Sequence, residues 1–288
     1  MTTYTGVADA NGDFTISFGA ENYNGGEKIT VTAEKNTATK SIELYAPSGV
    51  VGGGVIQFTG SLNDFPNNIG AVELHLSGSI GAYAFASNNV GAVWQKATGL
   101  IIKSGVISIE SNAFSSWVNA LSLVIPDSCV SIKNSAFRSW RSALSLVIPN
   151  SVVELEAYAF EGWSAALSFT LSSNITAIPA NCFQSWLAIK NIDIPEGVLQ
   201  IGSQSFAGAT ACLSLLLPSS LLSCTNNSFQ GLTSCNEITC FATTPPTITS
   251  TTFSILKSTC IIKVPAGSVE AYKAAPNWST FAARIQAI

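Results

Sequence analysis

Phenylalanine recurs in the apolar pattern of the chain at a nearly constant interval. Six of these residues lie 23 positions apart and a seventh follows after 24: Phe114, Phe137, Phe160, Phe183, Phe206, Phe229 and Phe253. A column of prolines and a column of isoleucine or leucine keep the same step. A period of roughly 20 to 50 residues is typical of solenoids, in which each repeat stacks on its neighbours. We therefore predict a solenoid over residues 63–266, with an earlier unit ending at Phe85 and a short insertion near residues 86–91.

Each repeat contains one short alternating run, of which LSLVIP is the clearest example. Leu121, Leu123 and Ile125 are expected to face the core. Ser122 and Val124 lie between them and are expected to face outward. An alternation of this kind indicates a β-strand with one buried face, and the proline that follows ends the strand.

The rest of the repeat returns the chain to the next strand. The segment DSCVSIKNSAF is expected to be a loop with Cys129, Ile132 and Phe137 turned inward, and SSWVNAL has the spacing of a helix or a turn. One strand and one crossing per repeat is the unit of a leucine-rich-repeat solenoid. The predicted fold class is therefore a mainly β solenoid with a parallel sheet on one face.

The repeats resemble a known family. Units such as SLVIPNSVVELEAYAFEGW and DIPEGVLQIGSQSFAGA look like the BspA-like leucine-rich repeats of bacterial and protist surface proteins. The final stretches CFATTPPTITSTTF and VPAGSVEAYKAAPNWSTFAARIQAI resemble the last repeat and cap of that family. The resemblance covers about residues 63–288. It implies the fold, and for the function it implies only that these repeats serve binding roles of many kinds.

The end of a solenoid needs a cover, because the last core layer would otherwise face water. Residues 267–288 are predicted to form this C-terminal cap. Two short helices are expected at 268–275 and 277–284, separated by Pro276 and N-capped by Ser268 and Asn277. The side chains expected over the end of the stack are Tyr272, Trp278, Phe281 and Ile285.

Residues 1–50 follow a different pattern. The runs TTYTGVA, DFTISF, KITVTAE and TKSIELYA alternate in polarity and are separated by turn-rich segments, which predicts antiparallel strands. They resemble half of a bacterial immunoglobulin-like repeat of the kind found in adhesins and phage virion proteins. Either such a domain has been cut, or these strands pack against the first repeats. Residues 51–62, which include GVVGGG, are expected to be a linker.

Tryptophan forms a column of its own with the same period: Trp94, Trp117, Trp140, Trp163 and Trp186. Such a ladder could stack sugar rings or anchor a protein partner. It could also fill the core. Three of these tryptophans are followed three positions later by alanine, so a large side chain is compensated by a small one, as close packing requires. We favour packing.

The seven cysteines fall at inward positions of the repeats, which favours buried free thiols. Cys212 and Cys235 share one column in adjacent repeats, so a disulfide between them stays open. No pair has the CxxC spacing of a structural zinc site, and we predict no metal site.

Composition excludes several partners. Charged residues make up only 10% of the chain, the net charge is -4, and the 13 basic residues form no cluster, which disfavours nucleic acid. No apolar run approaches the roughly 18 residues that would span a bilayer, so no membrane insertion is expected. The first residues show no secretory signal.

Catalysis has little support in the sequence. His75 is the only histidine and is expected to face solvent on its strand. No nucleophile elbow, zinc-protease, phosphate-loop or dinucleotide motif is present. Asp193 and Glu196 flank Pro195, but nothing else converges on them. We predict a non-enzymatic protein with no catalytic residues and no cofactor.

The outward strand positions remain as the predicted binding residues: Ser122, Val124, Ser145, Val147, Ser168, Thr170, Asn191 and Asp193. This strip is nearly uncharged through its first half. It suits a protein surface, a glycan or a second copy of the chain better than an ionic ligand.

Two functions follow from this strip. The first is a recognition or adhesion module, either on a bacterial surface or as a phage receptor-binding protein. The second is a structural virion component, such as a head decoration or tail-fibre protein, docked on a virion scaffold. The starting Met and the missing signal favour the virion, whereas the family resemblance favours an extracellular adhesin.

Overall fold

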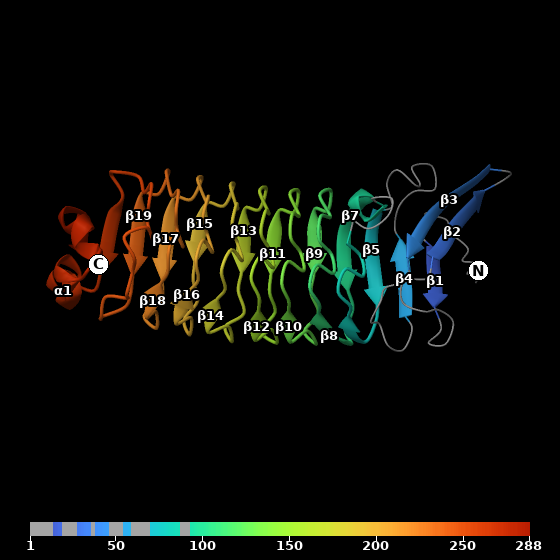
Figure 1. The fold of residues 1–288 in the computed structure, drawn as a ribbon, viewed down its shortest axis with the longest axis horizontal. Helices are drawn as coiled ribbons and strands as arrows, with labels where there is room; N and C mark the ends of the chain where they lie inside the picture. The colour runs from blue at the N-terminus through green and yellow to red at the C-terminus, as the bar shows by residue number, and fades with distance from the viewer. Residues whose placement is uncertain (1–13, 19–27, 36–37, 46–53, 59–69, 87–92) are drawn as a thin grey trace.

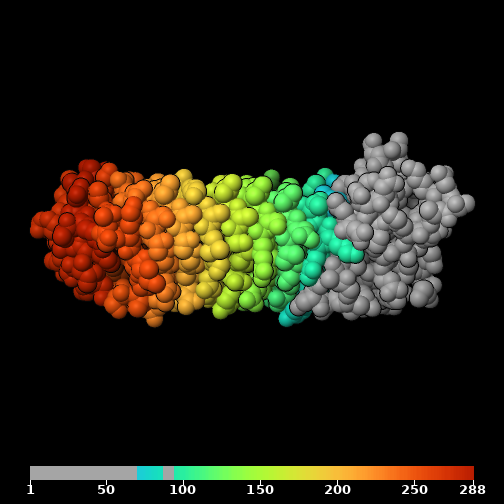
Figure 2. Space-filling view, turned by 90° about the horizontal axis from the view of Figure 1, so that it is seen from above, coloured from blue at the N-terminus to red at the C-terminus, as the bar shows by residue number. Residues whose placement is uncertain are grey.

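The computed structural model describes residues 14–18, 28–35, 38–45, 54–58, 70–86 and 93–288. Residues 70–86 and 93–288 form a straight rod in which the repeats follow one another along the axis (Figure 1). The rod is also straight when it is turned by 90° (Figure 2). The predicted solenoid is therefore confirmed, and it does not curve into a horseshoe.

A parallel ladder of strands runs along one face of the rod, as predicted. Most neighbouring strands pair one repeat apart, for example Ser145 with Ser168 and Asn191 with Ser214. The strands of this first ladder are β5 (Gly70–His75), β7 (Ala97–Ile102), β9 (Ser122–Val124), β11 (Ser145–Val147), β13 (Ser168–Thr170), β15 (Asn191–Asp193), β17 (Ser214–Leu217), β19 (Glu237–Cys240), β20 (Ile261–Val264) and β21 (Ile285–Ala287).

A second parallel ladder lies where the sequence predicted a loop, and that prediction was wrong. Its strands are β6 (Gly78–Ile80), β8 (Val106–Ile109), β10 (Ser131–Ile132), β12 (Glu154–Leu155), β14 (Ala177–Ile178), β16 (Gln200–Ile201) and β18 (Ser223–Cys224). Most of these strands are two residues long. Ser131 and Ile132 are both buried, so these short strands do not show the alternation of buried and exposed residues by which a strand is recognised.

The second ladder explains why the rod is straight. A solenoid curves when one face needs more room per repeat than the other. Here both faces are built from strands, and strands in a parallel ladder are about 4.8 Å apart. The two faces therefore advance equally along the axis, and the faces of the rod stay flat.

Two aromatic stacks fill the space between the ladders. The phenylalanine rings from Phe85 to Phe253 stack one repeat apart with centroid spacings of 5.1 to 5.8 Å. The indoles from Trp94 to Trp186 stack beside them at 5.5 to 5.8 Å. Trp117 and Ala120 are both fully buried. The packing interpretation of the tryptophan column is confirmed.

Each indole also satisfies its polar atom inside the core. Trp117 donates its Nε1–H to the carbonyl oxygen of Phe85 at 2.7 Å, and Trp140 donates to Phe114 at 2.7 Å. The next two tryptophans bond in the same way to phenylalanine carbonyls.

The SSWVNAL segment is a succession of turns, with Ser116 at a φ of 66°. Later repeats place glycine at the equivalent position, for example Gly162 at 81°.

The C-terminal cap covers the last core layer. It consists of η2 (Ala266–Ser268), α1 (Val269–Ala274), η3 (Trp278–Arg284) and β21. Tyr272 and Trp278 are buried, as expected, and donate to the carbonyl oxygens of Ala242 and Pro246, both at 2.7 Å. The second predicted helix is a 3₁₀ helix, and the chain after it adds a strand to the first ladder.

The two predicted N-cap residues, Ser268 and Asn277, do lie at the N-cap positions of α1 and η3. Neither Ser268 nor Asn277 makes a side-chain capping bond. Instead the Ser268 hydroxyl donates to the carbonyl oxygen of Thr243 at 2.7 Å, and the Asn277 amide donates to that of Ile248 at 2.7 Å. These side chains tie the cap to the last repeat, which takes precedence over helix capping.

The N-terminal strands are β1 (Phe14–Phe18), β2 (Lys28–Lys35), β3 (Ala38–Tyr45) and β4 (Gly54–Phe58). β2 and β3 form a hairpin. β1 pairs with β4, and β4 pairs antiparallel with β5, so these two strands extend the sheet of the solenoid. The segment assigned as a linker, residues 51–62, thus contains β4. The other residues of that segment lie outside the described residues, as do the TTYTGVA run and most of the insertion near 86–91. The short helix η1 (Val93–Lys96) follows the insertion.

Removal of one indole should destabilise the rod. Trp117 is stacked on both sides and bonded to a backbone carbonyl, so Trp117→Ala leaves a cavity and an unpaired acceptor. We expect the free energy of unfolding to fall by about 3–5 kcal/mol in urea denaturation. Leu144→Ala, at a half-exposed position, is the control and should cost less than about 1 kcal/mol. Loss of binding with unchanged stability in Trp117→Ala would contradict the packing interpretation.

Candidate binding surfaces of the solenoid

The strand face is the name we give to the outward side of β9, β11, β13 and β15. All eight predicted binding residues lie on it and are exposed: Ser122, Val124, Ser145, Val147, Ser168, Thr170, Asn191 and Asp193. The ladder register sets Val147 beside Thr170 and Ser145 beside Ser168. Leu146, between the two outward residues of its strand, is buried. The structure therefore brings the predicted residues together in two adjacent columns, and their role in binding stays a prediction.

A column of leucines borders the strand face and was placed wrongly by the sequence. Leu121 was expected in the core, yet Leu121, Leu144, Leu167 and Leu213 are 42 to 53% exposed. The turn that precedes the strand explains this. The Ala120 N–H donates to the carbonyl oxygen of Trp117, and Ala120, not Leu121, points inward. The leucines therefore enlarge the apolar part of the strand face.

Charge on the strand face increases toward the C-terminal end. The outward residues of β9, β11 and β13 are uncharged, whereas β15 carries Asp193. Further along, Glu237 pairs with Lys263 at 2.8 Å, and this hydrogen bond holds the pKa of Glu237 below its usual range. Thr239, which follows on the same strand, is buried. The open and apolar part of the face is thus its N-terminal half.

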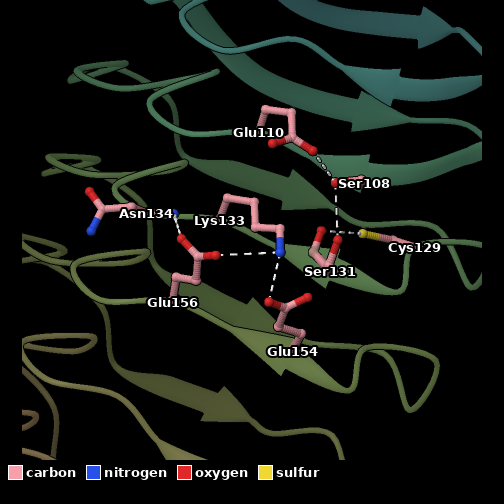
Figure 3. Close-up of polar contacts among 8 residues, drawn as sticks. All are labelled: Ser108, Glu110, Cys129, Ser131, Lys133, Asn134, Glu154 and Glu156. Atoms are coloured by element: carbon pink, nitrogen blue, oxygen red, sulfur yellow. Dashed lines mark hydrogen bonds and ion pairs between the residues drawn. The ribbon is translucent and has the colours of Figure 1, made fainter.

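A polar network crosses the second ladder (Figure 3). Lys133 lies between two carboxylates, 2.7 Å from Glu154 and 3.3 Å from Glu156. The hydrogen bond to Glu154 raises the pKa of Lys133 above its usual value. The Asn134 backbone N–H donates to Glu156 at 3.0 Å. These groups satisfy one another, and in the described part of the chain no set of three or more His, Cys, Asp or Glu side chains is arranged to hold a metal ion.

Glu196, one of the two carboxylates beside Pro195, is engaged in hydrogen bonds to the next repeat. Glu196 accepts from the backbone N–H and hydroxyl of Ser219, at 2.8 and 3.0 Å, and these contacts lower its pKa. Glu196 thus ties two repeats together. His75 is exposed, as expected, and lies 2.7 Å from Glu73 on the same strand.

All seven cysteines are buried and none is paired in a disulfide, so the prediction of free thiols is confirmed. The sulfur atoms of Cys235 and Cys260 lie 3.8 Å apart. Burial raises the pKa of Cys129 to about 11 and moves the pKa of Cys182 and Cys224 in the same direction. These thiols act as small apolar side chains.

A second set of exposed aliphatic residues was missed by the sequence reasoning. They lie at the start of the second-ladder strands, one repeat apart: Ile107, Val130, Val153, Leu199 and Leu222, with Thr176 in the same column. We call these six residues the aliphatic stripe. The 23-residue period would have aligned them, but the segment was interpreted as a loop.

Short repeats whose strands stack as parallel ladders on a shared core make this protein a solenoid. The chain belongs to the family described as the BspA type leucine rich repeat region, which matches residues 78–212 and 176–275 in six copies. The resemblance in the repeats is thus confirmed. The immunoglobulin-like assignment of residues 1–50 stays a prediction.

Solved structures of three bacterial proteins resemble the chain. A leucine rich repeat protein of T. pallidum has a TM-score of 0.49 and 18% identity, over 58% of this chain and 73% of its own. A leucine rich cell surface protein of Faecalibacterium prausnitzii has a TM-score of 0.34 and 16% identity, over 83% and 93%. The pneumococcal vaccine antigen PcpA has a TM-score of 0.27 and 12% identity, over 100% and 98%.

No curated protein matches the chain. Across the described residues, no helix has the length and apolar character needed to cross a membrane.

The buried thiols should resist labelling. The thiolate is the reactive form of cysteine. Burial blocks access to all seven thiols and also raises the pKa of several of them, such as Cys129. We expect DTNB at pH 8 to label none of the seven thiols in the folded protein and all of them in guanidinium chloride. The control variant Ser173→Cys places a thiol at an exposed position and should be labelled at once. Rapid labelling of the unmodified protein would contradict the assignment.

Proposed function

We propose that the protein is a non-enzymatic recognition or adhesion module that binds a protein or glycan surface through its strand face. The observation that carries this proposal is the row of exposed valines and leucines on an uncharged part of the rod. Val124 and Val147 are 49% and 59% exposed, and the leucines from Leu121 to Leu167 lie beside them. A contiguous apolar patch of this kind is characteristic of an interaction site.

The rigidity of the strand face supports the same function. Its backbone is held by ladder bonds, and its side chains stand on a core of stacked aromatic rings. A preorganised surface loses little conformational entropy when it binds. Membership of a leucine-rich-repeat family, whose members are typically binding proteins without enzymatic activity, is consistent with this proposal.

The shape of the strand face narrows the kind of partner. A flat face cannot enclose a ligand, so it suits a broad surface such as a cell-surface protein or a glycan layer. We propose that this binding takes place at a bacterial cell surface. The F. prausnitzii protein is itself described as a cell surface protein.

A structural role in a virion is the second candidate, and the straight rod favours it. A rod with a constant rise per repeat is suited to act as a spacer or as an assembly surface in a head decoration or tail fibre. Assembly of the purified chain on phage particles, without any cell ligand, would support this role.

Charge placed on the strand face should abolish attachment. We expect Val124→Arg combined with Val147→Arg to reduce binding to target cells by at least about tenfold, because burial of two guanidinium groups is costly. Binding of the labelled protein to cells is measured by flow cytometry, and the thermal midpoint confirms the fold.

The matched control adds the same charge on a different side. Thr210→Arg with Asn226→Arg changes two exposed turn positions and should leave attachment unchanged. Unchanged attachment of the valine variant, or equal loss in the control, would contradict a role for the strand face.

A further inference from the structure

The aliphatic stripe is a surface that the proposed function does not use. Its five aliphatic members are 38 to 60% exposed, and they recur at one position of every repeat from Ile107 to Leu222. Thr176 is the single polar member. The stripe belongs to the second ladder, and the turn that begins at Pro126 separates it from the strand face.

The backbone holds the stripe rigidly. The Val130 N–H donates to the carbonyl oxygen of Ile107 at 2.7 Å, and the Val153 N–H donates to that of Val130 at 3.0 Å. The Leu222 N–H donates to that of Leu199 at 2.8 Å. The core beneath is already filled, for example by Cys129. These side chains therefore cannot turn inward to escape water.

Several charged groups of the second ladder and its turns are already paired within the chain. Lys133 bonds to Glu154 and Glu156 (Figure 3), and Glu196 accepts hydrogen bonds from two serines. Groups that are satisfied by internal partners lose less when a second surface covers them. These paired groups therefore oppose contact along the stripe less than free charges would.

We propose that a second copy of this chain packs along the aliphatic stripe. The stripe repeats at one strand spacing, about 4.8 Å, over roughly 24 Å. A partner can match successive side chains only if it has the same period, and another copy of the chain has it. Identical ladders of small apolar side chains interdigitate well.

The absence of charge also points to a second copy. A two-fold contact sets the same surface patch of each copy against the other. A charge in the patch would therefore be brought into the contact twice, with the same sign. The stripe has no charged member. A contact of this size lies at the lower end of specific interfaces, which implies a weak dimer that leaves both strand faces open.

Sedimentation velocity of the full chain, from about 5 to about 500 µM, tests this proposal, because that range spans the dissociation constants of weak interfaces. We expect the sedimentation coefficient to rise from that of a monomer to that of a dimer. Val130→Lys with Val153→Lys should stay monomeric throughout. The milder pair Ile107→Thr with Leu222→Thr should weaken the dimer several-fold and is less prone to misfold.

The matched control is Leu144→Lys with Leu167→Lys, which adds the same charge at leucines of similar exposure beside the strand face. We expect it to dimerise like the unmodified chain. A monomeric unmodified chain at the highest concentration would overturn the proposal, and so would loss of the dimer in the control with retention in both stripe variants. Attachment to cells is measured separately, so failure of one proposal does not decide the other.

Discussion

The bond from each indole between Trp117 and Trp186 to a phenylalanine carbonyl in an earlier repeat is the interaction on which the central part of the solenoid depends. An indole N–H without a partner would be costly in a dry core. The bond at 2.7 Å between Trp140 and Phe114 fixes the ring relative to the backbone of its neighbour. Once the ring is fixed, the residue three positions later packs beside it in the core: Ala143 is fully buried there, and Ile189 fills the same position after Trp186. That alanine in turn determines that Leu144 points outward. The apolar border of the strand face is thus a consequence of core chemistry.

The period of the chain made most of this fold predictable. Columns that agree over many repeats identify the solenoid, the inward cysteines and the outward pairs such as Ser122 and Val124, because every repeat must solve the same packing problem. The C-terminal cap was predictable for a related reason, since an open core layer requires a cover. The family match is in accord with these assignments.

Other features could not be derived from local patterns. Most strands of the second ladder have two residues, which is too short for alternation to show, and their bonds join residues one repeat apart. The side of Leu121 depends on a turn whose hydrogen bond involves Trp117 and Ala120, not on the strand itself. Ser268 and Asn277 bond to the preceding repeat instead of their own helices, a choice that only tertiary structure makes. The exposed leucines beside the strand face and the aliphatic stripe were missed for the same reasons. The candidate surfaces therefore include more residues than the eight that were predicted.

The straight double ladder also has a mechanical consequence. The strands lie across the rod, so the hydrogen bonds between them run along its axis. When the two ends are pulled apart, these bonds carry the force in series. Under tension such an array yields repeat by repeat, because each repeat contacts only its neighbours. A rod of this kind, bound at one end and pulled by flow at the other, would lengthen in small steps. The unfolding of single repeats would absorb the force, so the contacts with the binding partner would be kept.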